Sequence, residues 1–398
     1  MHLCCQIYPE MLTRHMKLTR RGESASTTPR GGAAPLEFHN VTKRYPGSRT
    51  PAIEDLSLTV PAGEICVLVG PSGCGKTTAM RLVNRMIDLS GGDILIDGRS
   101  VLETNPADLR RDIGYVIQQV GLFPHVSIAH NITTVPRLLG WDKKRMQERC
   151  DELLDLVGLP RDLADRFPNQ LSGGQRQRVG VARALAADPP LMLMDEPFGA
   201  IDPINRERLQ SEFLRLQSEI KKTIVFVTHD IDEAIKMGDR IAILREGGEL
   251  VQYDTPERIL AEPADEFVAQ FVGADRGLKR LALTTLGQMN LPRPPVVPLG
   301  QVVDLPPAEG WDEMVVVDGD GRPVGALRPG TRPSGPVQPG DTQPLERVIG
   351  ADATMRDALS LMMTDSLGPL VVLDATGRVS GYVSLELINR SLRPKAPA

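Results

Sequence analysis

Ile65-Cys66-Val67-Leu68-Val69 is a continuous apolar run, and a glycine-rich loop follows it directly. That loop reads Gly70-Pro71-Ser72-Gly73-Cys74-Gly75-Lys76-Thr77, with Thr78 next. An uninterrupted apolar run predicts a parallel strand that is buried on both faces. Glycines allow backbone amides to curl around phosphates, and the helical pattern from Lys76 to about Met86 adds a favourable dipole. This order of strand, loop and helix predicts a nucleotide-phosphate site.

A pair of carboxylates follows a second apolar run. The run from Leu191 to Met194 predicts another buried strand, and Asp195 and Glu196 come directly after it. A carboxylate held beside a phosphate loop is placed to hold the Mg²⁺ shell, so we predict Asp195 as a metal ligand. Lys76 is expected to reach the β- and γ-phosphates, and the hydroxyl of Thr77 to bind Mg²⁺. The expected cofactors are therefore ATP and Mg²⁺.

Two further segments complete the pattern, namely Leu171-Ser172-Gly173-Gly174-Gln175 and Thr228-His229-Asp230. With the phosphate loop and the carboxylate pair, they make the chain resemble the ATP-binding-cassette (ABC) transporter ATPases, whose signature sequence is LSGGQ. The resemblance implies that Glu196 polarises the attacking water and that His229 contacts the γ-phosphate. It also implies hydrolysis by positioning and electrostatics rather than by covalent catalysis.

The same resemblance implies roles for two residues outside these motifs. Gln118 occupies the position of the family's Q-loop glutamine, which senses the γ-phosphate and Mg²⁺ and links them to the permease. Gln119, one residue later, is the alternative. Tyr45 is in the position where the family stacks an aromatic ring on adenine, an interaction worth roughly 1–3 kcal/mol for stacked bases. Local packing at a strand edge is the alternative for Tyr45.

The signature segment implies that the working unit is a pair of chains. Ser172 and Gly174 begin a helix whose N-terminus can bind phosphate. In the family, this segment contacts the γ-phosphate held by the opposite subunit. The chain has one cassette, so we expect a homodimer. Residues 199–202 resemble the D-loop across that interface, and Ile201 stands where leucine is usual. The ATP contacts expected from the partner are therefore Ser172, Gly173, Gly174, Gln175 and Asp202.

The chain alternates strand and helix patterns over most of its length. Strands are predicted at 36–41, 65–69, 115–117, 191–194 and 223–227, and helices at 76–86, 144–157, 174–187 and 203–220. This alternation predicts an α/β fold with a mostly parallel sheet. A hairpin at 241–251, turning at Gly247-Gly248, closes the domain near Gly273. The resemblance adds an antiparallel β subdomain and a helical subdomain, so residues 36–274 are predicted to form an ABC-type P-loop ATPase domain.

Composition shifts after about residue 274, where proline becomes frequent. Residues 314–325 and 370–381 resemble each other, and each reads as strand, tight Asp/Gly turn, strand. The second copy is preceded by a capped helix start at 353–359 and followed by a helix at 385–391. The repeat resembles a tandem pair of cystathionine-β-synthase-type (CBS) domains with an α+β fold. We expect a joint at 275–281, a degenerate first CBS unit at 282–340 without the preceding helix, and a second at 341–394.

Nucleotide-binding CBS domains typically carry Gly-x-x-Thr-x-x-Asp after the second strand. This chain has Ser384 at the hydroxyl position and Leu387 in place of the aspartate, and residues 325–331 also lack it. Binding of AMP or ATP in the usual mode is therefore not expected. The resemblance leaves open cyclic di-AMP inhibition, ionic-strength sensing and a purely structural dimerisation module. The acidic tail of some relatives is absent, and Arg390, Arg393 and Lys395 make this end basic.

The segments around the cassette favour an importer of osmoprotectants. Residues 121–125 resemble the segment that receives the permease's coupling helix, and residues 166–170 are also typical of importers. Residues 267–281 resemble the joint between cassette and CBS domains in importers of glycine betaine, choline, carnitine or proline betaine. An importer of another amino acid, a polyamine or an anion is the alternative. A soluble ABC protein is a more remote alternative, because such proteins usually fuse two cassettes or insert long coiled coils, and this chain does neither.

Bulk properties limit the partners. The 398 residues suffice for two or three domains, and a net charge of −5 does not favour nucleic acid. No apolar run approaches the ~18–20 residues that cross a bilayer, so a membrane role requires separate permease subunits and, through them, an extracytoplasmic substrate-binding protein. The five cysteines lack metal-ligand spacing and are typical of a reducing cytoplasm. We therefore expect the protein at the cytoplasmic face of the membrane, bound through the permease. Residues 1–35 are predicted to be a disordered tail or the result of a mis-assigned start codon.

Overall fold

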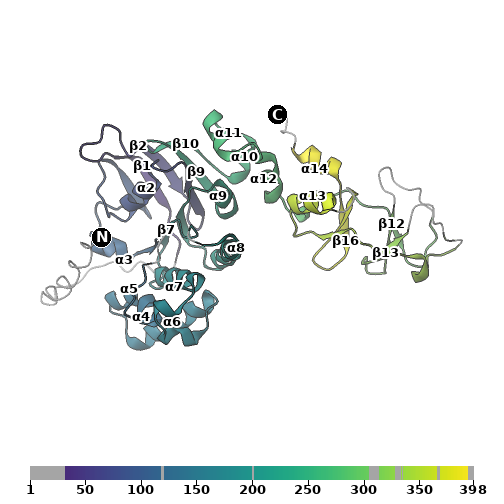
Figure 1. The fold of residues 1–398 in the computed structure, drawn as a ribbon, viewed down its shortest axis with the longest axis horizontal. Helices are drawn as coiled ribbons and strands as arrows, with labels where there is room; N and C mark the ends of the chain where they lie inside the picture. The colour runs from purple at the N-terminus through teal and green to yellow at the C-terminus, as the bar shows by residue number, and fades with distance from the viewer. Residues whose placement is uncertain are drawn as a thin grey trace.

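The computed structural model describes residues 32–117, 121–199, 201–303, 313–327, 333, 335–364 and 368–392. Its N-terminal part is built around a sheet with the strand order β10-β9-β3-β8-β7-β6 (Figure 1). Neighbouring strands are parallel except β10, which runs antiparallel to β9. The strands are β3 (Ile65–Val69), β6 (Ile113–Val116), β7 (Leu191–Asp195), β8 (Thr223–Val227), β9 (Arg240–Arg245) and β10 (Glu249–Asp254).

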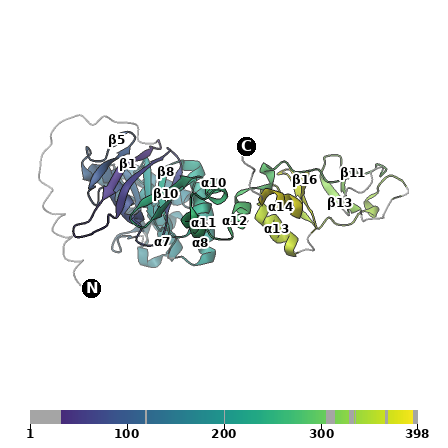
Figure 2. The ribbon, with the colours of Figure 1, turned by 90° about the horizontal axis from the view of Figure 1, so that it is seen from above.

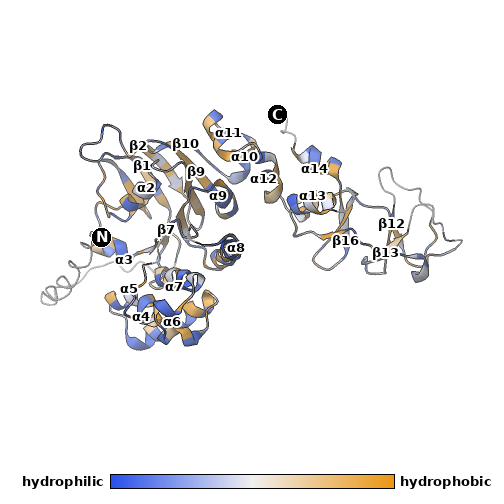
Figure 3. Ribbon diagram, viewed as in Figure 1, coloured by the Kyte–Doolittle hydropathy of each residue, from blue (hydrophilic) through white to orange (hydrophobic). Residues whose placement is uncertain are grey.

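Both faces of this sheet are covered, which explains the continuous apolar runs. Cys66 and Leu68 of β3 face one hydrophobic cluster, while Val67 and Val69 face another on the opposite side. All four side chains are fully buried. Burying an aliphatic side chain contributes about 1.5–3 kcal/mol, so the central strands anchor the domain. Figure 3 shows these strands toward the hydrophobic end of the scale, while helix α6 carries both hydrophilic and hydrophobic residues.

A separate antiparallel sheet covers one of these faces, as the family resemblance predicts. Its strand order is β2-β1-β4-β5. Leu36, Phe38 and Ile53 from this sheet share a cluster with Ala79 and Met80 of the helix after the phosphate loop. The strands are β1 (Leu36–Lys43), β2 (Ile53–Val60), β4 (Gly91–Ile96) and β5 (Arg99–Ser100).

Most of the helices pack on the other face, and those that lie between β6 and β7 in the sequence form a helical region. The helices of the cassette are α2 (Lys76–Val83), α3 (Pro106–Arg111), α4 (Ile128–Ile132), α5 (Thr134–Leu138), α6 (Lys143–Leu156), α7 (Gly173–Leu185), α8 (Pro203–Ile220), α9 (Ile231–Met237), α10 (Pro256–Ala261) and α11 (Glu266–Val272), with 3₁₀ turns η1 (Arg161–Asp165) and η2 (Pro168–Gln170). The predicted helix at 76–86 ends earlier, because Asn84 leaves the helical conformation and Arg85 adopts a φ of +49°. No helix in the described ranges is long and apolar enough to cross a bilayer.

Two small sheets of the same design form the C-terminal part. In each, the first strand pairs in parallel with the second, and the second pairs antiparallel with the third. The sheets consist of β11 (Val296–Pro298), β12 (Met314–Val317) and β13 (Pro323–Leu327), and of β14 (Val348–Gly350), β15 (Leu370–Leu373) and β16 (Val379–Val383). The other elements are α12 (Arg276–Leu283), α13 (Met355–Thr364), α14 (Leu385–Leu392), η3 (Leu286–Gln288) and η4 (Pro339–Asp341).

The predicted sequence repeat has a local physical cause. Asp318 accepts hydrogen bonds from the backbone N–H groups of Asp320 and Arg322, and Asp374 does the same for Thr376 and Arg378. The hydroxyl of Thr376 also donates to Asp374, and it is the largest cause of the lowered pKa of that carboxyl, while the N–H of Arg322 is the largest cause for Asp318. Each turn also contains a glycine with φ near +80°, where a side chain would be strained. The same Asp-centred turn therefore joins the second and third strands of both sheets.

Helix α12 lies between the cassette and the C-terminal sheets (Figures 1 and 2). Leu281 of this helix and the following Leu286 are buried in the cluster formed with Met355, Ile388 and Val383. The boundary predicted at residue 282 therefore falls inside one packed core, since a local sequence pattern does not report which later strands a helix will cover.

Candidate active site

The phosphate loop connects β3 to α2 in a conformation that requires glycine. Gly75 has a φ of +100°, and a Cβ added there would collide with the carbonyl oxygen of Ala52. A Cβ at Gly70 would collide with the carbonyl oxygen of Leu244. The loop is therefore held between the β1–β2 connection and strand β9. Its curled backbone can present N–H groups to a polyphosphate.

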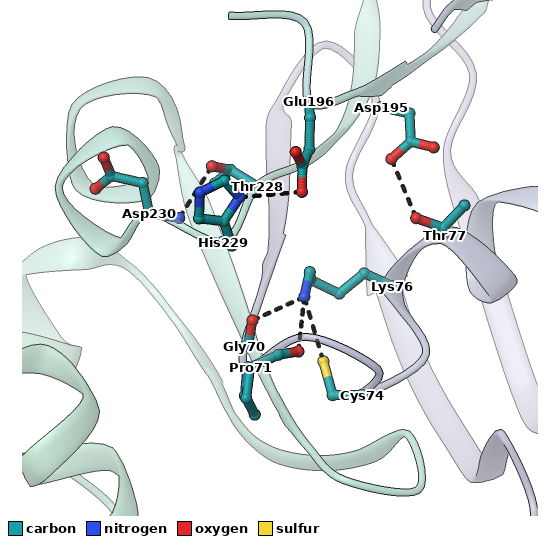
Figure 4. A network of polar contacts seen from close by, with 10 residues as sticks. All are labelled: Gly70, Pro71, Cys74, Lys76, Thr77, Asp195, Glu196, Thr228, His229 and Asp230. Carbon is teal, nitrogen blue, oxygen red and sulfur yellow. Dashed lines mark hydrogen bonds and ion pairs between the residues drawn. The ribbon is translucent and has the colours of Figure 1, made fainter. Parts of the chain in front are cut away.

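Lys76 is the buried cation of this loop. Its side chain is only 7% exposed, and its ammonium donates to the carbonyl oxygens of Gly70 at 2.7 Å and Pro71 at 2.9 Å. The sulfur of Cys74 lies 3.6 Å from the same nitrogen (Figure 4). A buried ammonium that is held by neutral acceptors keeps its charge available for an anionic ligand.

Thr77 in the first turn of α2 and Asp195 at the end of β7 lie side by side, although they are far apart in sequence. The Thr77 hydroxyl donates to Asp195 Oδ1 at 3.2 Å. Burial raises the pKa of Asp195, and the hydrogen bond from Thr77 opposes that effect. A hydroxyl and a carboxylate oxygen side by side are the hard ligands that Mg²⁺ takes from proteins when phosphates supply the rest. The pair therefore fits the predicted Mg²⁺ site.

Glu196 has an unusual backbone for its residue type. Its φ is +43°, a left-handed conformation that costs a non-glycine residue roughly 1–2 kcal/mol. The N–H of Glu196 donates to the carbonyl of Val227 at 3.0 Å, which holds the residue in place. The Glu196 carboxylate then lies 3.0 Å from His229 Nδ1 (Figure 4). The ends of β7 and β8 thus bring these two predicted catalytic side chains together.

The signature segment forms the start of α7. Ser172 Oγ accepts from the N–H of Gln175 at 3.2 Å, and the Gln175 side chain accepts from the N–H of Ser172 at 2.9 Å. This capping box fixes the first turn of the helix. A Cβ at Gly173 would meet nothing within 4 Å, so open space lies in front of the helix. Asp202, the N-cap of α8, lines the same cavity of about 410 Å³.

Of the remaining predicted site residues, the structure describes Tyr45. Tyr45 follows β1, the residue is 38% exposed, and Lys43 Nζ lies 5.2 Å from its ring centroid. The connection that carries Tyr45 reaches the phosphate loop at Ala52. Gln118 and its alternative Gln119 lie outside the described residues.

Arg183 is a residue near the site that sequence reasoning missed. It lies in the last turn of α7 and donates to the carbonyl oxygen of Gly121 at 2.8 Å. Burial lowers the pKa of its guanidinium. The contact joins the helix that starts with the signature to the segment after the Q-loop position. No local signal marks it, because a basic residue near a helix C-terminus is ordinary.

Replacing Gly75 with alanine should weaken ATP binding about tenfold or more, because the new Cβ displaces the loop from Ala52. Gly98→Ala is the matched control, since Gly98 has a φ of +70° and open space around it. Both variants carry backbone strain, and only Gly75→Ala disturbs the phosphate loop. Calorimetric titration with Mg²⁺ and ATP, alongside thermal melts, separates the two effects. Equal ATP affinity in both variants would contradict the proposal that the glycine-rich loop binds the phosphates of ATP.

The parallel sheet, the glycine cradle and the carboxylate pair define an ABC-type ATPase. The family model described as ABC transporter matches residues 53–199. The osmoprotectant import ATP-binding protein OsmV of Salmonella typhimurium is 45% identical over 363 residues, which cover 89% of this chain and 95% of the relative. The choline transport ATP-binding protein OpuBA of Bacillus subtilis is 43% identical, over 89% of this chain and 80% of the relative. The chain belongs to this family of transporter ATP-binding proteins.

Solved structures agree with this assignment. The dimeric structure of MJ0796, a bacterial ABC transporter cassette, matches with a TM-score of 0.50 and 34% identity over 56% of this chain and 98% of that one. The structure of cbiO1 from Clostridium perfringens, part of the ABC transporter complex cbiONQ, matches with a TM-score of 0.53 and 25% identity, over 57% of this chain and 91% of that one. The predicted ABC-type α/β fold is therefore confirmed for the cassette.

Proposed function

We propose that the chain is the ATP-hydrolysing subunit of an importer for quaternary-amine osmoprotectants such as glycine betaine, choline, carnitine or proline betaine. The observation that carries this proposal is the extent of the similarity. It covers 89% of this chain and 95% of the osmoprotectant-import relative, and so includes the C-terminal part as well as the shared cassette. A glycine betaine/carnitine/choline transport protein of Bacillus subtilis extends over 91% of this chain at 43% identity.

The site residues divide into binding and catalytic roles. Lys76 and the loop amides bind the phosphates, Thr77 and Asp195 hold Mg²⁺, and Tyr45 stacks on adenine. When bound, Mg²⁺ neutralises charge on the phosphate oxygens. Glu196 accepts a proton from the attacking water, and His229, 3.0 Å from its carboxylate, contacts the γ-phosphate. Gln118 completes the set as the residue that senses the γ-phosphate and metal.

The signature residues act on a second copy of the chain. The cavity at the start of α7 is lined by Ser172, Gly174 and Asp202, and it contains no cation from the phosphate loop of the same chain. A phosphate bound to the partner's loop fits this place, since helix N-termini attract anions. The solved relative MJ0796 is described as dimeric, which supports a homodimer here.

The permease contacts the helical region at the cytoplasmic face of the membrane. Phe123 and Phe167, from the two segments typical of importers, are 52% and 43% exposed. The N–H of Ile128, three residues after the first segment, donates to the carbonyl of Arg166 in the second segment at 2.8 Å. Exposed aromatic side chains on adjoining loops are typical of a protein contact. The cargo-binding protein acts indirectly through the permease.

The two C-terminal sheets are a degenerate CBS pair. The strand order and the Asp-centred turn that the two sheets share support this assignment. In the part of the chain that the structure describes, helices before and after the last two strands occur in the second unit, as α13 and α14, and not in the first. Ser384 Oγ accepts from the N–H of Leu387 and thus caps α14. Cyclic di-AMP binding, ionic-strength sensing and dimerisation remain the three candidate roles.

Uptake of labelled glycine betaine tests the cargo. A strain lacking this gene, with its native permease present, would carry either the unchanged gene or Glu196→Gln, and uptake is measured at low and high osmolarity. Uptake restored only by the unchanged gene, and reduced by excess choline or carnitine, supports the proposal. Uptake of a polyamine, an anion or another amino acid instead of glycine betaine would support the alternative cargo class and contradict the proposal.

A further inference from the structure

Helix α9 follows His229, the residue proposed to contact the γ-phosphate, with only Asp230 between them. Asp230 caps α9 by accepting from the N–H groups of Asp232 at 2.8 Å and Glu233 at 3.2 Å. His229 immediately precedes this cap and lies 3.0 Å from the Glu196 carboxylate. The position of the first turn of α9 therefore influences where His229 lies relative to Glu196.

Lys279 of α12 fixes that first turn from outside the cassette core. Its ammonium lies 3.1 Å from Asp232 Oδ1 and 3.3 Å from Asp275 Oδ1, and it donates to the carbonyl of Val272 at 2.8 Å. The lysine side chain is 11% exposed, although both carboxylates are mostly exposed. Three acceptors around a nearly buried ammonium give it one defined position. Lys279 thus joins α9 to the end of α11 and to α12.

The residues after Lys279 connect the same helix to the C-terminal part. Arg280 donates to the carbonyl of Ser391 in α14 at 3.4 Å, and Leu281 is buried in the cluster with Met355 and Ile388. Leu283 packs in the other direction, against the main cassette core. Helix α12 therefore contacts the helix behind His229 on one side and the second C-terminal sheet unit on the other.

We infer that Lys279 is a positioning residue that holds His229 through Asp232 and transmits the packing of the C-terminal part to the ATP site. The inference rests on the proposed role of His229. The contacts of Lys279 are with Asp232, Asp275 and the carbonyl of Val272, none of which is assigned to the nucleotide or the metal, so we expect it to act on the rate of hydrolysis and not on ATP affinity. An ion pair with one exposed partner contributes about 0.2–1 kcal/mol, which corresponds to a change of up to about fivefold.

The first test compares single substitutions in the full-length chain. Lys279→Met should lower kcat for ATP up to about fivefold with KM unchanged, and Asp232→Asn should do the same. The double variant should be no worse than either single variant, because both remove one contact. Lys279→Arg retains the charge and should restore most of the rate. Arg276→Met is the matched control, since Arg276 is an exposed cation on the same helix.

The decisive test repeats Lys279→Met in a His229→Ala background, with single-turnover hydrolysis as the readout. If Lys279 acts through His229, the second substitution has no further effect there. The same loss in both backgrounds would show a general structural role and overturn the inference, as would an unchanged kcat in Lys279→Met alone. A His229→Ala chain that hydrolyses ATP normally would instead refute the role of His229 and with it this part of the proposed function.

Discussion

Replacing Glu196 with glutamine should give a protein that binds ATP but hydrolyses it at least about 100-fold more slowly. The amide has the size of the carboxylate and can keep the contact with His229, but it cannot accept a proton from water. ATP affinity should not fall, because Lys76 and the loop amides are unchanged and one negative charge near the phosphates is gone. The closed, ATP-bound dimer should therefore accumulate.

The measurements are phosphate release, ATP titration and the dimer fraction by size-exclusion chromatography with ATP. Glu257→Gln is the matched control, since Glu257 is an exposed glutamate in α10 and its substitution makes the same chemical change. Normal turnover in Glu196→Gln would refute the assignment of Glu196. Loss of ATP binding would instead show that the carboxylate maintains the loop rather than activating water.

The elements nearest the nucleotide could be predicted from the sequence because their determinants are local. The run 65–69 is apolar at every position, and β3 has these bounds. Pro203–Ile220 is likewise predicted and observed as α8, which starts at the Asp202 cap. In both cases the residues that decide the structure lie within or next to the element. The sequence predicts Thr77 and Asp195 each as a Mg²⁺ ligand, and the structure shows their side chains in contact.

Other features of the site depend on contacts between distant residues and had no local signal. A glutamate does not favour a positive φ, and the conformation of Glu196 depends on the carbonyl of Val227 in β8. In the sequence, Arg183 and Lys279 look like ordinary helical cations. Only the folded chain shows which carbonyl oxygens they contact. The placement of Leu281 and Leu286 against α13 similarly depends on residues about 70 positions later in the chain.

Replacing Gly174 with aspartate should leave folding and ATP binding intact and abolish most hydrolysis. Gly174 is in the first turn of α7, where a carboxylate stabilises the helix by about 0.3–1 kcal/mol. The nearest atom to an added Cβ is Leu209 Cδ1 at 3.8 Å, so the substitution fits within the chain. The new charge, however, occupies the place proposed for the partner's γ-phosphate. Repulsion there should reduce turnover at least about 100-fold.

Gly174→Ala separates charge from size, because it adds the Cβ alone and should be affected much less. The experiment is sharpest in the Glu196→Gln background, where ATP is expected to trap a dimer. Glu196→Gln should elute as a dimer with ATP, while Glu196→Gln/Gly174→Asp should bind ATP and stay monomeric. Because the phosphate loop is intact in both, only an action of the signature on a second chain explains such a difference. If the double variant forms the dimer equally well, the signature segment does not bind the partner's ATP, and the proposed action on a second chain is wrong.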